Sequence, residues 1–220
     1  MNSRKKALEL SRLYVIVNPR DPGPLPLEAV VREAAAGGAD IIQLRDKDEP
    51  DHEMVLRARA LSKIAHDHGA LFIVNDRIQV AWDAGADGVH LGQEDPSILE
   101  ARKILGERTV GKSTHSIEQA LRAQEEGADY LGLGPIFATP TKPEYAAIGL
   151  DIIAQARALI RIPFFVIGGI DHENLGEVLR RGASRVAVVR AVVLEENPRA
   201  SCERFKNRLQ FTNLAIEQGS

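Results

Sequence analysis

The sequence has little cysteine, no excess of one charge and no long apolar run, and each shortage excludes a class of protein. Cys202 is the one cysteine among 220 residues, so no internal disulfide can form, and it lacks the Cys and His neighbours of a zinc site. The net charge is −3 with both signs mixed along the chain, which argues against nucleic-acid or anionic-membrane partners. The basic run 4–6 precedes only a short apolar segment, so neither a signal peptide nor a membrane span is predicted. A cytoplasmic protein is expected.

What the sequence does contain is a recurring phrase, Gly-Ala-Asp at 38–40, 85–87 and 127–129, with Gly-Ala-Ser at 182–184. Each copy ends a helical stretch and opens an apolar run. Glycine just past a helix is a common stop, and the run behind it is typical of a buried parallel strand. Together with similar runs elsewhere, the phrase predicts strands over Leu13–Val17, Asp40–Leu44, Leu71–Asn75, Gly88–Leu91, Thr109–Lys112, Tyr130–Leu133, Pro163–Ile167 and Arg185–Val189.

Helices are expected between these strands, because apolar positions recur there at three- and four-residue spacing. They cover Leu27–Ala36, His52–His68, Ser97–Leu105, Ile117–Glu126 and Asn174–Arg181. Asp95 before Pro96, and Ser116 with Gln119, suggest helix N-caps. The alternation predicts an α/β fold, a single (β/α)8 TIM barrel in one domain over 1–220. Residues 1–11 are an N-terminal extension, and the polar stretch 211–220 is expected to fray.

Active sites of such barrels lie just past the carboxyl ends of the strands. The second strand ends in Gln43, Arg45 and Lys47, which alternate and therefore point to the same side. They predict a cationic cluster that binds an anion, the alternative being a solvated loop. Asp76 and Asp95 follow the next two strands and could hold Mg²⁺ beside a polyphosphate, or could simply cap helices.

Past the fifth strand, Ser113 could donate to a phosphate or merely fill a turn. His115 is either a general acid/base or, as we favour, a loop histidine bonded to backbone, and His90 is expected to be a satisfied core histidine. The long connection 134–149 is typical of a functional loop or of a flexible surface loop, and Thr139, Thr141 and Lys142 are its donors. Gly168-Gly169 and Val189-Arg190 suggest a phosphate site, although the glycines could form a plain turn.

Five of these segments, taken in their order along the chain, resemble the thiamine-phosphate synthase family. The resemblance runs from about Leu13 to Ala191. The segments are Gln43-Leu44-Arg45-Asp46-Lys47, Asn75-Asp76, Gly88-Val89-His90-Leu91-Gly92-Gln93-Glu94-Asp95, Gly134-Pro135-Ile136-Phe137-Ala138-Thr139-Pro140-Thr141-Lys142 and Gly168-Gly169-Ile170. The resemblance implies a transferase that joins 4-amino-2-methyl-5-(diphosphooxymethyl)pyrimidine to 4-methyl-5-(2-phosphooxyethyl)thiazole. The products would be thiamine monophosphate and pyrophosphate, formed by a Mg²⁺-assisted dissociative displacement.

The resemblance also implies roles for individual residues. The pyrimidine diphosphate would be held by Gln43, Leu44, Arg45, Asp46, Lys47, Asn75, Ser113 and Lys142. Of these, Arg45, Lys47, Ser113 and Lys142 would assist catalysis, and Asp76 and Asp95 would bind Mg²⁺. The thiazole phosphate would meet Thr139, Pro140, Thr141, Gly169, Val189 and Arg190.

One position departs from the family, which commonly has a small hydroxyl residue where this chain has Arg190.

Two other functions fit the same fold. A thiazole tautomerase of the same superfamily uses a histidine near the position of His115, and a non-catalytic barrel could sense thiamine phosphates. The expected partners are small phosphorylated substrates and, in a homodimer, a second copy of the chain.

Overall fold

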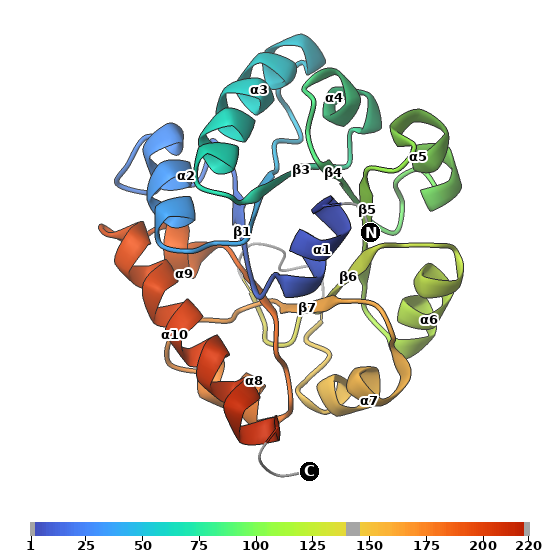
Figure 1. Ribbon diagram of the computed structural model, residues 1–220, viewed down its shortest axis with the longest axis vertical. Helices are drawn as coiled ribbons and strands as arrows, with labels where there is room; N and C mark the ends of the chain where they lie inside the picture. Colours follow the sequence, from blue (N-terminus) through green and yellow to red (C-terminus); the bar gives the residue numbers. More distant parts are fainter. Residues whose placement is uncertain (1–2, 140–145, 218–220) are drawn as a thin grey trace.

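The strands follow one another around a closed ring. The computed structural model describes residues 3–139 and 146–217, with side chains as far as residue 210. Each strand pairs in parallel with the next, and the last closes on the first, as Figure 1 shows along the ring axis. The strands are β1 (Leu13–Val17), β2 (Ile41–Leu44), β3 (Leu71–Asn75), β4 (Gly88–Leu91), β5 (Thr109–Thr114), β6 (Tyr130–Leu133), β7 (Phe164–Ile167) and β8 (Val186–Val188). The predicted TIM barrel and its strands are confirmed.

Helices surround the ring and bury their apolar stripes against it (Figure 1). In α2, for example, Val30, Val31 and Ala34 are buried, at the spacing that places one helix face on the sheet. The five predicted helices are confirmed to within one residue at each end. The outer helices are α2 (Leu27–Ala36), α3 (Asp51–Asp67), α4 (Ile78–Asp83), α5 (Ile98–Leu105), α6 (Ile117–Glu125), α7 (Asp151–Leu159), α8 (Leu175–Arg180), α9 (Arg190–Val193) and α10 (Pro198–Glu217).

The recurring phrase has a structural role at the end of the barrel where strands begin. Its glycines have φ between 72° and 93°, the left-handed conformation that stops a helix. Its aspartates then reach to neighbouring strands: Asp40 accepts from the Leu13 N–H at 2.9 Å, and Asp87 accepts from the Phe72 N–H at 2.9 Å. Asp129 accepts from the Val110 N–H at 2.8 Å. Each aspartate therefore ties its own strand to an adjacent one.

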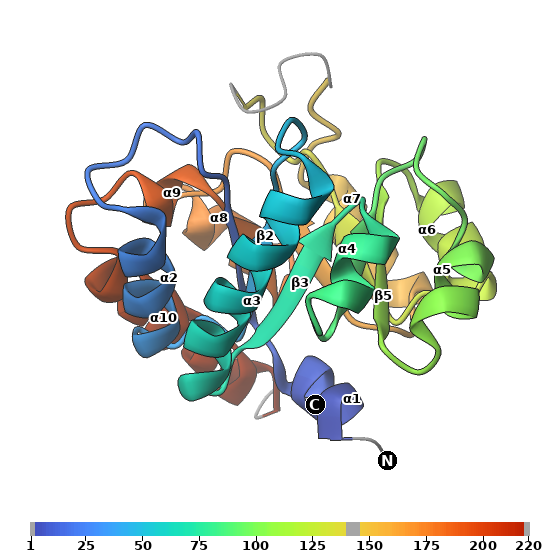
Figure 2. The same cartoon turned by 90° about the horizontal axis from the view of Figure 1, so that it is seen from above.

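A short helix, α1 (Ser3–Leu10), lies below the ring at that same end (Figure 2). Its Leu8 is buried and packs with inward-facing strand residues such as Ile41 and Leu71. The expected N-terminal extension is thus the helix that covers the bottom of the barrel. At the C-terminus, the chain stays helical to Glu217, past Phe211 where fraying was expected. No glycine or proline interrupts the helix before Gly219.

The two expected N-caps need correction. Helix α5 is capped by Ser97, whose hydroxyl accepts from the Glu100 N–H at 3.2 Å, so Asp95 is not its cap. Ser116 does cap α6, but the Gln119 side chain accepts from the His115 N–H and not from Ser116 itself. Ser97 lies directly before α5 and is therefore nearer to its first turn than Asp95 is. The Asp95 carboxylate is thus available for other contacts.

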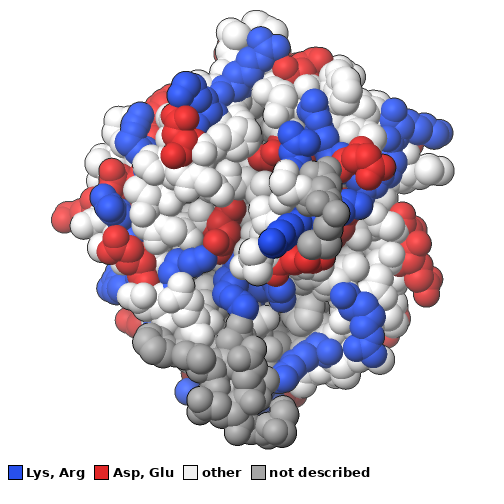
Figure 3. All heavy atoms as spheres, in the orientation of Figure 1, with Lys and Arg blue, Asp and Glu red and all other residues white. Residues whose placement is uncertain are grey.

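The charge distribution on the surface and the burial of the single cysteine agree with what the composition predicts. On the described part of the α1 face, Lys and Arg alternate with Asp and Glu and form no wide field of one sign (Figure 3). None of the helices among the described residues is long and apolar enough to span a bilayer. Cys202 is buried in α10, and burial raises its thiol pKa to about 12, so it is a poor nucleophile.

Candidate active site

A cavity of about 430 Å³ opens at the carboxyl ends of the strands, opposite α1. Its floor is made by inward-facing strand residues, and its walls by the loops that follow them. Eight residues that the sequence singles out for substrate binding line it together: Gln43, Arg45, Asn75, Ser113, Thr139, Gly169, Val189 and Arg190. Pro140, Thr141 and Lys142 lie outside the described residues. Side chains far apart in sequence thus share one concave site, the usual location of chemistry in this fold.

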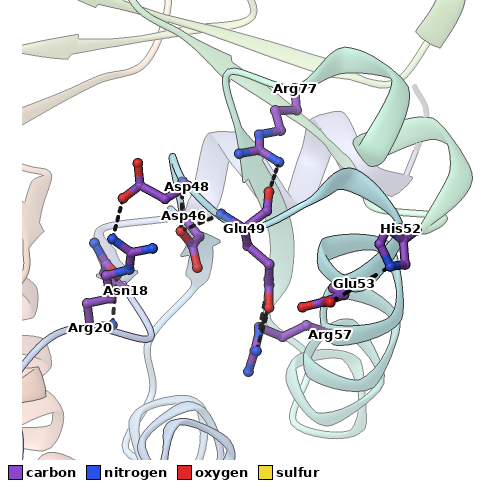
Figure 4. Close-up of polar contacts among 9 residues, drawn as sticks. All are labelled: Asn18, Arg20, Asp46, Asp48, Glu49, His52, Glu53, Arg57 and Arg77. Atoms are coloured by element: carbon purple, nitrogen blue, oxygen red, sulfur yellow. Dashed lines mark hydrogen bonds and ion pairs between the residues drawn. The ribbon is translucent and has the colours of Figure 1, made fainter.

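The loop between β2 and α3, which presents Arg45 and Lys47, is held by a polar network of its own (Figure 4). The Asp46 carboxylate accepts from the Asp48 N–H at 3.0 Å and turns into this loop, away from the cavity. Leu44 is fully buried in the layer between strands and helices. The structure therefore places Leu44 and Asp46 outside the cavity lining, where they shape the loop.

Two further contacts anchor the same loop. Glu49 is 7% exposed and accepts from Arg57, with Nε at 3.0 Å from Oε2 and Nη2 at 2.5 Å from Oε1 (Figure 4). The Arg77 guanidinium donates to the Glu49 carbonyl oxygen. Such a bidentate, largely desolvated pair restricts motion more than an exposed ion pair does. The backbone that orients Arg45 is therefore fixed from both sides.

Asp76 and Asp95 come together as a carboxylate pair that shares a hydrogen bond. Burial and the neighbouring Asp95 raise the pKa of Asp76 to about 6. Burial also acts on Asp95, but the hydrogen bond from Asp76 and the Gly92 N–H at 2.5 Å lower its pKa below the ordinary value. The Lys47 ammonium lies 3.6 Å from Asp76. Neither carboxylate caps a helix, since the residue that precedes α4 is Arg77.

This pair offers hard oxygen ligands of the kind Mg²⁺ prefers. Among the described residues no group of three or more His, Cys, Asp or Glu side chains gathers around one point. A cation held here would therefore take two protein carboxylates and complete its shell with water and phosphate oxygens, which is the usual Mg²⁺ arrangement. The donor set thus fits magnesium better than zinc, which needs more protein ligands.

The cavity floor contains a chain of hydrogen bonds between Gln43 and Ser113. Gln43 Nε2 lies 2.7 Å from the Tyr14 hydroxyl, which is 2.9 Å from the Tyr130 hydroxyl. Tyr130 in turn lies 3.1 Å from His90 Nδ1, and His90 Nε2 lies 2.9 Å from Ser113 Oγ. His90 is thus a satisfied histidine, as expected, although it also lines the cavity.

His115 behaves as the loop histidine that we favoured, with Nδ1 at 2.5 Å from the Gly134 carbonyl oxygen. The glycines after β7 lie opposite this segment. Gly168 and Gly169 have φ of 104° and 65°, and a Cβ on Gly169 would lie 2.9 Å from the Ala138 carbonyl oxygen. The turn after β7 therefore needs glycine on two grounds, and its backbone lies directly on the cavity.

Sequence reasoning missed Asp21 as a site residue. It lines the cavity, and burial raises its pKa against the opposing fields of Arg45 and Arg190. These two cations thus face one carboxylate from different loops. Asp21 lies in a polar loop after β1 with no recognisable motif, so position after a strand was the one signal that could have identified it.

Known proteins resemble this chain over nearly its whole length. Residues 13–192 match the family described as thiamine monophosphate synthase. The thiamine-phosphate synthase of Thermosynechococcus vestitus is 45% identical over 210 residues, which are 95% of this chain and 59% of that protein. This chain thus spans under two thirds of that relative's length. The thiamine-phosphate synthase of Chloroflexus aurantiacus is 41% identical, with 91% of this chain and 94% of that protein covered.

Among solved structures, a thiamine phosphate pyrophosphorylase from Pyrococcus furiosus superposes with a TM-score of 0.86 at 38% identity. The match covers 96% of this chain and 99% of that one. The matched family segment contains all eight strands and every described cavity residue named above. The chain belongs to the thiamine monophosphate synthase family.

Proposed function

We propose that this chain is a thiamine-phosphate synthase. It joins 4-amino-2-methyl-5-(diphosphooxymethyl)pyrimidine to 4-methyl-5-(2-phosphooxyethyl)thiazole and releases thiamine monophosphate and pyrophosphate. The observation that supports this most is the position of Arg45 and Asn75 on the cavity. Lys47 follows Arg45 by two residues, and Asp76, which pairs with Asp95, follows Asn75 directly. Cations beside paired carboxylates suit a metal-bound diphosphate, whereas a monophosphate alone would not need both.

Asp76 and Asp95 would hold Mg²⁺, which when bound neutralises charge on the diphosphate. Arg45, on the cavity, and Lys47, beside Asp76 and outside the cavity lining, would bind the remaining phosphate oxygens, and Ser113 would donate one hydrogen bond. These contacts strengthen as charge grows on the leaving group, so they stabilise the transition state more than the substrate. Lys142 is proposed for the same role and lies outside the described residues.

The reaction is then a displacement at the pyrimidine methylene carbon. The carbon–oxygen bond breaks and its electron pair leaves with pyrophosphate, while Gln43 and Asn75 hold the ring. The thiazole nitrogen gives its lone pair to the resulting methylene cation, forming the new carbon–nitrogen bond. No proton transfer is needed at either atom, which agrees with His115 being bonded to the Gly134 carbonyl.

The thiazole phosphate would bind opposite, at the loops after β7 and β8. Backbone N–H groups near Gly169 and Val189 can approach an anion closely, and Thr139, Pro140 and Thr141 complete the proposed site. Arg190 would add a guanidinium where the family commonly has a hydroxyl.

We further propose that the chain forms one domain and acts in the cytoplasm on small phosphorylated substrates. The homodimer stays a prediction.

The test is to incubate the protein with both substrates, with and without Mg²⁺, and to follow thiamine monophosphate and pyrophosphate. Both products should appear in equal amounts only when the metal is present, and EDTA should abolish them. Isomerised thiazole phosphate without coupling would identify a tautomerase instead. Tight binding of thiamine monophosphate without turnover would identify a sensor, and either result would overturn the proposal.

A further inference from the structure

The two tyrosines of the hydrogen-bond chain below the cavity are enclosed by aromatic rings. Tyr14 and Tyr130 are 2% and 0% exposed, and both pack edge-on against Phe165, with ring centroids 5.2 Å and 5.8 Å away. A Cβ on Gly111 would lie 2.1 Å from Tyr130 Cζ, so the glycine on β5 makes room for this ring. Packing therefore holds both tyrosine rings, and with them the positions of the two hydroxyl groups.

The direction of the chain follows from its first member. The Gln43 amide nitrogen can only donate, so the Tyr14 oxygen accepts from it. The buried Tyr14 hydroxyl must also donate, and among the described residues the Tyr130 oxygen is the acceptor at hydrogen-bond distance, so the Tyr14 hydrogen points to Tyr130. Tyr130, which already accepts from Tyr14, gives its own hydrogen to His90 Nδ1. A neutral His90 then has its hydrogen on Nε2 and donates to Ser113 Oγ.

Both ends of this chain line the cavity, and they are left with opposite polarity. Ser113 accepts from His90, so its single hydrogen must point elsewhere, and the open side of Ser113 is the cavity. Gln43 gives one amide hydrogen to Tyr14, which fixes the orientation of the amide, and no hydrogen bond from the described residues reaches its carbonyl oxygen. One end thus presents a hydroxyl donor and the other an amide acceptor.

We propose that Tyr14, Tyr130 and His90 are positioning residues that make Ser113 a dedicated donor to an anionic oxygen and hold the Gln43 amide with its carbonyl oxygen available as an acceptor. This inference rests on the proposed function for the identity of the anion, a diphosphate oxygen. A serine without such a chain could rotate and accept a hydrogen bond as readily as it donates one. Here the orientation is set before the ligand arrives, which lowers the ordering cost of binding.

The two tyrosines provide a directional test, because each can lose its hydroxyl while its ring stays in place. In Tyr130→Phe the His90 Nδ1 atom loses its donor, so His90 should become a mixture of tautomers and Ser113 should be free to rotate. In Tyr14→Phe the Tyr130 hydroxyl can still donate to His90, so the Nε2–H tautomer should persist while Gln43 is released. The second variant is therefore the matched control for the first.

The tautomer is read from ¹⁵N chemical shifts of the histidine-labelled protein, and the donor role from the affinity for inorganic pyrophosphate with Mg²⁺. We expect the Nε2–H form in the wild type and in Tyr14→Phe. We expect Tyr130→Phe to bind pyrophosphate about three- to tenfold more weakly, the loss typical of one hydrogen bond. Adding Ser113→Ala to Tyr130→Phe should then cost little more, because the two changes remove the same contact.

An Nδ1–H tautomer in the wild type would reverse the chain and overturn the inference, whether or not the variants fold. Unchanged pyrophosphate affinity in a folded Tyr130→Phe would also overturn it. If the tautomers follow the expected pattern while no thiamine monophosphate forms, the proposed function fails and the positioning chain still stands.

Discussion

Replacing Asp76 by asparagine should stabilise the folded protein at neutral pH while removing the proposed metal site. Burial and Asp95 raise the pKa of Asp76 to about 6, so the folded state prefers the protonated acid. Because the folded pKa lies above that of the unfolded chain, the stabilising contribution is complete in acid and is lost as pH rises through about 6. Asparagine never ionises, and its amide can still donate to Asp95.

The size of the effect follows from the shift. Moving an aspartate from about 3.9 in the unfolded chain to about 6 corresponds to roughly 3 kcal/mol at pH 8, an upper limit. The Asp76 side chain keeps 22% exposure and Lys47 lies 3.6 Å away, so solvent and this cation reduce the penalty. We therefore expect Asp76→Asn to exceed the wild type by about 1 to 2 kcal/mol at pH 8. The difference should fall to about a third of that near pH 4.5, where the aspartate of the unfolded chain is still mostly ionised.

The assay is urea unfolding in EDTA between pH 4.5 and 8, with Asp83→Asn as the control because Asp83 is an exposed aspartate on nearby α4. Adding Mg²⁺ and pyrophosphate should then stabilise the wild type and Asp83→Asn but not Asp76→Asn, since a ligand stabilises the state that binds it. A stability difference that stays constant over this pH range, or an Asp76→Asn variant weaker than wild type at pH 8, would refute the reasoning about the carboxylate pair.

Three other substitutions separate chemistry from stability. Arg45→Ala should lower kcat/KM by about two to four powers of ten and leave the melting temperature unchanged; a matching loss of stability would instead indicate a packing role. Gly169→Ala should lower the free energy of unfolding by about 1 to 2 kcal/mol in urea titration, because φ is 65° there; no loss would contradict the strain argument. Glu49→Gln should cost about 1 to 2 kcal/mol and expose the loop to proteolysis, since Arg57 loses its charged partner but is 32% exposed and can be solvated; an intact loop would disprove the anchoring role.

The fold could be predicted because its signals are local. Each helix stop, such as Gly85 with φ of 72°, is followed within a few residues by its strand, and burial on both faces makes the strand mostly apolar. The end of each strand then identifies the candidate site without any knowledge of distances, and this located Arg45 and Asn75 correctly on the cavity.

Contacts that need the closed ring could not be predicted. Tyr14 and Tyr130 sit inside apolar runs and read as ordinary core residues, although they meet in the barrel interior. Their polar role depends on the register that sets Gly111 beside Tyr130, which no single strand encodes. Competition between nearby groups was equally hidden, since Ser97 takes the cap that Asp95 could have formed.

The two ends of the barrel therefore have different roles. At the bottom, Asp40, Asp87 and Asp129 bond backbone N–H groups and join strands, so removing them should act on stability. At the top, polar side chains such as Arg45 and Asn75 face a cavity, so removing them should act on turnover. Between the ends lie Leu8 and the tyrosine layer, which close the interior from below. A buried, largely apolar layer beneath the cavity lowers the local dielectric, and this strengthens charge–anion contacts above it.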